Sequence, residues 1–296
     1  MLTLSTGQAW YASYDVNIKT IGLLSLVGIP YTWKFLWSPF IDRFILPVFG
    51  KRRGWIALMQ LLLAIVMLAL SFETPKEAPY FIAFLLVLIA FFSASQDIAI
   101  NAYQTEILAP EERGIGAAMY VSGYRIALLL SGGVAIGLAG VLGWRIVFIL
   151  LAVLMLASIA ITIYAPEPEN ISTPKTIKSA VFLPLKEFLS RKNALAILLF
   201  IVIYKLGDNF AQALLSAFFI KGLGFSLVDV GVAYKLTGFS GVLLGVYIGG
   251  FFVLRMGLFR SLLLFGIFQM LSTLMFFWLN DLGKVYHVFI LSVFVE

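Results

Sequence analysis

Long apolar runs alternate with short polar connections along this chain. The runs cover residues 21–42, 55–72, 80–104, 114–138, 145–165, 194–219, 229–254 and 259–279. Each approaches the roughly 20 residues that a helix needs to cross a bilayer. Residues 1–14 and 285–296 are also apolar but reach only about 21 and 18 Å as helices. The pattern predicts an all-α polytopic membrane protein with about eight full and two partial spans, and we expect a fragment because both ends stop inside apolar runs.

The polar connections fall into two sets that differ in charge. Connections 43–54, 105–113, 166–193 and 255–260 together hold 12 Lys and Arg residues, whereas the connections between them hold five. Basic residues accumulate on the cytoplasmic side of membrane proteins. The first set is therefore predicted to be cytoplasmic.

The longest polar connection, residues 166–193, predicts a helix of its own. Apolar residues recur there at helical spacing among basic residues, namely Ile177, Val181, Leu185, Phe188 and Leu189. This pattern is typical of an amphipathic helix, which we expect to lie on the cytoplasmic leaflet.

The layout predicts a two-bundle, transporter-like architecture. An N-terminal bundle covers 1–165 with an incomplete first helix, the linker covers 166–193, and a truncated C-terminal bundle covers 194–296. The turns SPFIDRFILPVFGKRRG and GGFFVLRMGLFR resemble each other loosely. A repeat of this kind fits two parallel halves, although two unrelated basic turns explain it as well.

Composition narrows the classes of function. Hydrophobic residues make up 61% of the chain and charged residues 12%, whereas soluble chains average about 25% charged residues. The chain has no cysteine and a single histidine, His287, so we expect no enzyme, no metal and no cofactor. The net charge of +6 is attributed to cytoplasmic loops, not to binding of nucleic acid.

Five ionisable residues interrupt the apolar runs: Lys34, Asp97, Arg125, Lys205 and Asp208. A charge at bilayer depth costs roughly 2.5 kcal/mol or more, so it faces a partner or a water-filled path. Counted from the cytoplasmic ends, these residues lie about 12 to 21 Å deep, in one layer where transporters bind substrate. For Asp97 two hypotheses stay open, a role in transport and a fixed pair with Lys34 or Arg125.

Further polar residues form stripes on two of these helices, at spacings of three or four residues. The stripes consist of Ser93, Asp97, Asn101 and Gln104, and of Lys205, Asp208, Asn209 and Gln212. Such stripes line a path for a polar solute or hold helices together. Aromatic residues offer the same choice, because they stack on sugar rings or form a belt at the membrane interface; the candidates are Trp10, Tyr11, Tyr31, Trp33 and Trp37.

A second group of charges occupies the first cytoplasmic connection. It consists of Asp42, Arg43, Lys51, Arg52 and Arg53. We interpret these residues as a conformational latch and topology signal, not as a substrate site.

Three segments carry a resemblance to a known family. They are IGLLSLVGIPYTWKFLWSPFIDR, ASQDIAINAYQTEILAPEERGIGAAMYVSGYRIALLLSGG and YKLGDNFAQALLSAFFIKGLGF. They resemble the AmpG-type muropeptide permeases of the major facilitator superfamily. The resemblance implies a proton-coupled importer of anhydro-muropeptides in the bacterial inner membrane, and we expect a monomer in contact with membrane lipid. Acetyl-CoA transporter relatives share part of the first segment, so another bulky anionic solute stays open.

The resemblance also implies roles for individual residues, because the ligand carries carboxylates, amides and a disaccharide. The expected substrate-binding residues are Lys34, Tyr31, Gln96, Asn101, Arg125, Lys205 and Asn209, and the expected proton carriers are Asp97 and Asp208. The chain departs from the family at Asn101, where a carboxylate is frequent and an amide cannot exchange a proton. A membrane-embedded transferase and a non-functional truncated permease are the remaining alternatives.

Overall fold

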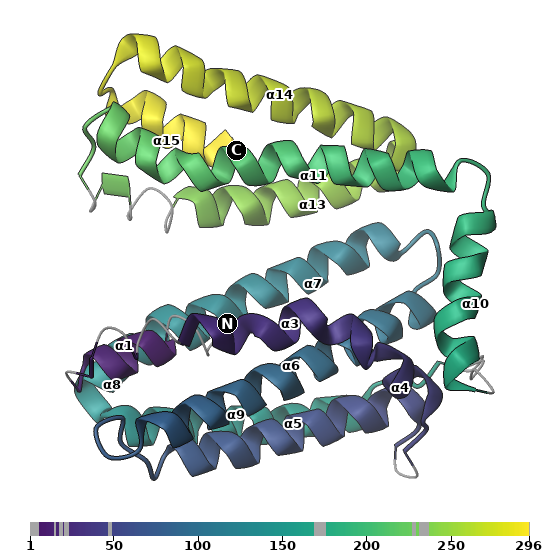
Figure 1. The fold of residues 1–296 in the computed structure, drawn as a ribbon. Coiled ribbons are helices and arrows are strands. Elements are labelled where there is room, and N and C mark those ends of the chain that lie inside the picture. The colour runs from purple at the N-terminus through teal and green to yellow at the C-terminus, as the bar shows by residue number, and fades with distance from the viewer. Residues whose placement is uncertain are drawn as a thin grey trace. The chain divides into compact units, whose positions relative to one another are not determined.

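The computed structural model consists of helices joined by short turns (Figure 1). It describes residues 6–14, 16–17, 20, 24–46, 49–168, 176–226, 229–230 and 237–295, and for residues 25, 177, 178, 207–214, 216, 217, 220 and 221 the backbone alone. Its contacts define two compact units. One comprises Met1–Leu108 and Ile126–Leu185, and the other comprises Ala109–Arg125 and Lys186–Glu296. The predicted boundaries at residues 165 and 194 stay a prediction.

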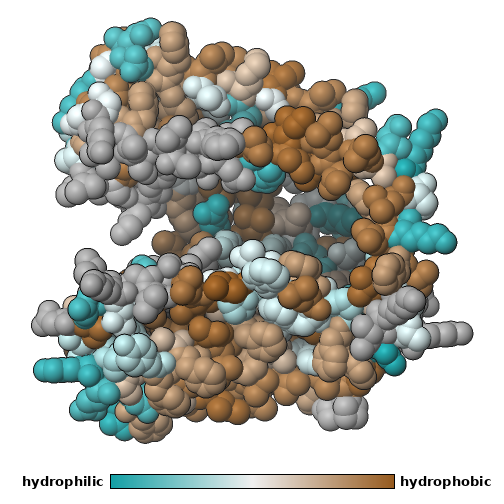
Figure 2. Space-filling model, in the orientation of Figure 1, coloured by the Kyte–Doolittle hydropathy of each residue, from teal (hydrophilic) through white to brown (hydrophobic). Residues whose placement is uncertain are grey.

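Within the described residues, six helices are long and apolar enough to cross a membrane. They are α5 (Lys51–Leu70), α6 (Pro79–Ile107), the helix Arg113–Leu142 formed by α7, η4 and α8, α9 (Trp144–Tyr164), α13 (Phe239–Met256) and α14 (Leu258–Leu282). Shorter apolar helical stretches are Ala194–Leu206, the first part of α11 (Ala194–Ala217), and α15 (Tyr286–Val295). Figure 2 shows hydrophobic side chains over much of the outer surface. The predicted all-α polytopic class is confirmed.

The apolar run 21–42 departs from the expected single span. Its described part is a series of short pieces: η2 (Leu24–Gly28), α3 (Ile29–Trp33), the 3-10 turn η3 (Lys34–Leu36) and α4 (Ser38–Arg43). Pro30 and Pro39 stand in the first turns of α3 and α4. Proline has no backbone N–H and its ring collides with the preceding turn, so no regular α-helix runs through both positions. We refer to residues 24–43 as the broken segment.

The core of the first unit lies where α5, α6 and α9 meet. Ala64, Ala90 and Ala152, one on each helix, are completely buried. Small residues let helix backbones approach closely, which is how helices in a membrane gain packing energy. Trp10 and Tyr11 of α1 (Gly7–Ala12) are also buried in this core, so these two are neither sugar-stacking residues nor a belt at the membrane surface.

In the second unit, phenylalanine rings form the core between α11, α14 and α15. The ring of Phe289 lies 4.8 Å from that of Phe219 and 4.3 Å from that of Phe225, between centroids. Helix α13 approaches α15 so closely at Gly241 that a Cβ atom there would lie 2.5 Å from the carbonyl oxygen of Phe294. Only glycine fits this crossing.

Replacing Ala152 by leucine tests the close packing of the first unit. The larger side chain overfills the core where α5, α6 and α9 meet, which destabilises the fold by about 1–3 kcal/mol. We therefore expect the Tm of the purified chain in detergent to fall by roughly 3 to 10 °C. Val153 on the same helix is 54% exposed, so Val153→Leu is the matched control and should leave the Tm unchanged. Unfolding is monitored by tryptophan fluorescence. Equal Tm values for the two variants would contradict this packing.

Candidate functional site

Lys34 and Asp97 form an ion pair in the first unit. Lys34 opens the 3-10 turn of the broken segment, Asp97 lies on α6, and the ammonium donates to Oδ2 of the carboxylate. The two side chains are 34% and 23% exposed, so the pair is shielded but not sealed. One of the two partners considered for Asp97, Lys34, is therefore present as a pair in the structure.

Two more contacts join the broken segment to α6 beside this pair. The hydroxyls of Tyr31 and Ser93 share a hydrogen bond, and the indole N–H of Trp37 donates to Oγ of Ser95 at 3.0 Å. Side chains three residues apart drift around an α-helix but line up in a 3-10 turn. The break at Lys34–Leu36 therefore helps Tyr31, Lys34 and Trp37 to face the same helix.

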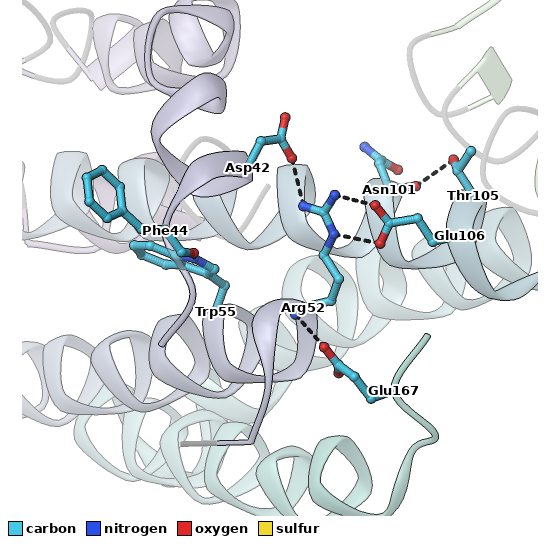
Figure 3. Close-up of polar contacts among 8 residues, drawn as sticks. All are labelled: Asp42, Phe44, Arg52, Trp55, Asn101, Thr105, Glu106 and Glu167. Carbon is cyan, nitrogen blue, oxygen red and sulfur yellow. Dashed lines mark hydrogen bonds and ion pairs between the residues drawn. The ribbon is translucent and has the colours of Figure 1, made fainter. Parts of the chain in front are cut away.

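The remaining polar residues of α6 have different surroundings. Gln96 is partly exposed, and Asn101 is exposed. The backbone carbonyl of Asn101 accepts a hydrogen bond from the Thr105 hydroxyl at 2.8 Å (Figure 3). The Asn101 side chain lies at the surface of α6.

The other predicted site residues belong to the second unit. Arg125 lies in the last turn of α7 (Arg113–Leu128), and its Nε atom is buried without a hydrogen-bond partner among the described residues. Lys205 is exposed on α11. The side chains of Asp208 and Asn209 lie outside the described part of the chain, so the layer of shared depth stays a prediction.

Arg52 forms the centre of a second charged cluster, at one end of the same bundle (Figure 3). Its Nη1 donates to Oδ1 of Asp42 at 2.7 Å, while Nε and Nη2 donate to the two carboxylate oxygens of Glu106, the former at 2.8 Å. A bidentate arginine–carboxylate pair is the strongest of the common charged hydrogen bonds. The Arg52 side chain is only 5% exposed, so its charge depends on these two carboxylates.

Glu167 connects this cluster to the end of α9. Its carboxylate accepts hydrogen bonds from the backbone N–H of Arg52 at 2.9 Å and from Nε of Arg53 at 3.0 Å. It thereby occupies the N-terminus of α5, where backbone N–H groups are unpaired and a negative charge is favoured. Arg53 in turn donates to the carbonyls of Ile163 and Ala165 at 2.9 and 2.8 Å. We call Asp42, Arg52, Arg53, Glu106 and Glu167 the clasp.

The clasp closely approaches Gly50. This residue caps α5 with φ +84°, and a Cβ atom there would lie 2.8 Å from the Glu167 carboxyl group. The left-handed backbone favours glycine, and a larger residue would displace the Glu167 carboxylate from the clasp.

The five predicted latch residues thus have unequal positions. Asp42, Arg52 and Arg53 belong to the clasp. The guanidinium of Arg43 lies 5.4 Å from the centroid of the Phe44 ring, and Lys51 is buried at the start of α5. Their role as a latch stays a prediction.

Sequence reasoning missed Glu106, Glu167 and Tyr103, whose hydroxyl donates to the carbonyl of Pro166 at 2.8 Å. A signal was present, because the two carboxylates follow predicted spans at the cytoplasmic end where the basic turn also lies.

Apolar helices of membrane-crossing length, with charges paired among them and at their ends, define a multi-pass α-helical membrane protein. Residues 3–295 match the Major Facilitator Superfamily. The chain belongs to this family, in its AmpG-type branch. It is a protein of the bacterial inner membrane, of a transporter family and not an enzyme, which confirms these expectations.

Three relatives show which proteins of the family the chain is similar to. The chain is 46% identical to the anhydromuropeptide permease of Escherichia coli over its whole length, and it spans 60% of the length of that protein. It is 38% identical to an uncharacterized protein of Haemophilus influenzae, over 93% of this chain and 66% of the relative. It is 31% identical to the putative transporter AmpG 4 of Rickettsia conorii, over all of this chain and 74% of the relative.

Removing the Arg52 side chain tests the clasp. Arg52→Ala leaves Asp42 and Glu106 without their shared cation. Because these two carboxylates are 39% and 28% exposed, the cost is below the roughly 3–5 kcal/mol of breaking a fully buried pair. We expect a clear loss of Tm in detergent. Arg191→Ala is the control, because Arg191 also pairs with a glutamate, Glu187 at 2.9 Å, but is 60% exposed, and such a pair contributes at most about 1 kcal/mol. A similar Tm loss in both variants would contradict the assigned role of Arg52.

Proposed function

We propose that this chain acts in proton-coupled import of anhydro-muropeptides, the wall-derived solutes named by its relative from Escherichia coli. The observation that carries the proposal is the ion pair between Lys34 of the broken segment and Asp97 of α6. A discontinuous membrane helix with a charged pair at the discontinuity is a recurring way to build a transporter site.

The chemistry of the pair fits an anionic solute. A lysine among apolar helices requires an anionic partner, and in the resting state Asp97 supplies it. A carboxylate of the peptide part of the solute replaces Asp97 at the Lys34 ammonium. The neighbouring Tyr31 hydroxyl and the Gln96 and Asn101 amides then offer hydrogen bonds to sugar or peptide groups.

Coupling to protons follows from the same exchange. When the solute takes Lys34, Asp97 loses the cation that pairs with it in the structure, and uptake of a proton by Asp97 replaces the positive charge that Lys34 supplied. Conversely, protonation of Asp97 frees Lys34 for the solute. Binding of the proton therefore favours binding of the solute, and binding of the solute favours binding of the proton, as reciprocal linkage requires.

The second unit contributes further groups to the proposal. Arg125 has a buried Nε atom without a partner among the described residues, which suits a second carboxylate of the solute. Lys205 and Asn209 are proposed to bind the solute as well, and Asp208 to carry a proton. We assign the latch function to Asp42, Arg43, Lys51, Arg52 and Arg53, and we propose that the protein works as a monomer.

Two alternatives to import of anhydro-muropeptides predict different results in a solute uptake experiment. Another bulky anionic solute, such as one handled by the acetyl-CoA transporter relatives, would compete with labelled anhydro-muropeptide or replace it in uptake. A non-functional chain would neither bind nor accumulate any of these solutes.

Uptake into proteoliposomes that contain the chain tests the ion pair. With an acidic exterior, we expect accumulation of labelled anhydro-muropeptide. Asp97→Asn should abolish the response to the proton gradient, because an amide cannot take up a proton. Lys34→Ala should raise the Kd for the solute by about tenfold or more, because a partly buried charge contact is lost.

The control is Lys76→Ala, a lysine exposed in the turn between α5 and α6, which should behave as the unchanged chain. Gradient-driven accumulation that persists in Asp97→Asn would exclude Asp97 as the proton carrier. Equal effects of Lys34→Ala and Lys76→Ala would exclude Lys34 from the solute site.

A further inference from the structure

Helix α10 (Ile177–Ser190) exposes apolar residues although it is not one of the membrane-crossing helices. All side chains from Val181 to Glu187 are exposed. Phe182, Leu183, Leu185 and Leu189 each expose between 52% and 60% of their surface. An apolar group of this size outside the lipid-facing spans marks a surface that binds something.

The connections of α10 hold it close to the membrane. Three residues separate its end at Ser190 from the start of α11 at Ala194, so the two ends lie at most about 14 Å apart. The turn is compact, because the N–H of Arg191 donates to the Phe188 carbonyl and the N–H of Ala194 donates to the Arg191 carbonyl, both at 3.1 Å. The helix therefore ends at the membrane surface, on the side to which the basic loops assign the cytoplasm.

Two faces of α10 differ in chemistry. At 100° per residue, Val181, Leu185, Phe188 and Leu189 lie on one side of the helix. Ser179, Lys186 and Ser190 lie on the other side, where Leu183 is the apolar exception. A helix with this division settles in the plane of a bilayer surface, with the apolar side among the acyl chains.

The charges at this end of α10 favour an anionic surface. Lys186, Arg191 and Lys192 are exposed, and the carboxylate opposing them is Glu187, which already pairs with Arg191. Lysine side chains extend along an apolar surface and place their ammonium groups at the level of the headgroups. Basic residues there are attracted to anionic lipids of the cytoplasmic leaflet.

We propose that α10 binds anionic phospholipid in the cytoplasmic leaflet. Val181, Leu185, Phe188 and Leu189 insert among the acyl chains, and the three cations contact headgroup phosphates. This adds a lipid site to the connection between the two predicted bundles, independently of the solute.

The complete chain reconstituted into nanodiscs tests the proposal. Because the chain lacks cysteine, Leu185→Cys and Ser190→Cys each accept one environment-sensitive nitrobenzoxadiazole label, on opposite faces of α10. In nanodiscs that contain phosphatidylglycerol, the label at position 185 should be quenched by brominated acyl chains and be at least about threefold less accessible to aqueous iodide than the label at 190, as expected for an interfacial helix.

The lipid charge is tested in the same nanodiscs. In pure phosphatidylcholine the contrast between the two positions should shrink, and Lys186→Gln with Lys192→Gln should shrink it in phosphatidylglycerol too, whereas Lys76→Gln should not. Equal accessibility of positions 185 and 190, protection at 185 without quenching by brominated lipid, or an unchanged contrast in phosphatidylcholine would each overturn the proposal. No outcome depends on solute uptake, so failure here is distinct from failure of the proposed function.

Discussion

The absence of water from a bilayer core is the constraint on which this structure depends. A charge placed there has no solvent to stabilise it, so the protein must supply an opposite charge or a path to water. The chain supplies opposite charges at two levels within its first unit, at the helix ends and deeper in the apolar runs. The clasp surrounds Arg52 with the carboxylates of Asp42 and Glu106 at the helix ends. Deeper in the chain's apolar runs, Lys34 meets Asp97.

The two arrangements differ in how readily they exchange partners. Arg52 is a rigid guanidinium with 5% exposure and three described hydrogen bonds to two carboxylates. Moving it therefore breaks several charged hydrogen bonds at once. Lys34 is a point charge on a flexible stem, a third exposed, and such an ammonium moves between acceptors with little geometric loss. The clasp is therefore suited to hold helix ends, and the deeper pair is suited to trade a carboxylate of the protein for one of a solute.

The sequence predicted what depends on local pattern and missed what depends on distant pairing. Hydropathy located most of the helices, because a span is a property of about 20 adjacent residues. Pro30 and Pro39 mark the break in the broken segment, whereas hydropathy alone predicts one continuous span there. Glu106 and Glu167 pair with Arg52 across 54 and 115 residues, and no spacing rule extends that far. For Asp97 the sequence offered two cations, and the fold shows a pair with Lys34.

On the proposed function, Asn101 gives the first unit a reason to bind an anionic solute. Lys34 and Asp97 together carry no net charge. A carboxylate at position 101 would lie one helical turn beyond Asp97 on the same face and would compete with an incoming solute for Lys34. An amide offers hydrogen bonds without that competition. We therefore propose that a carboxylate of the solute takes the place at Lys34, and that Asp97 carries the proton that balances the exchange.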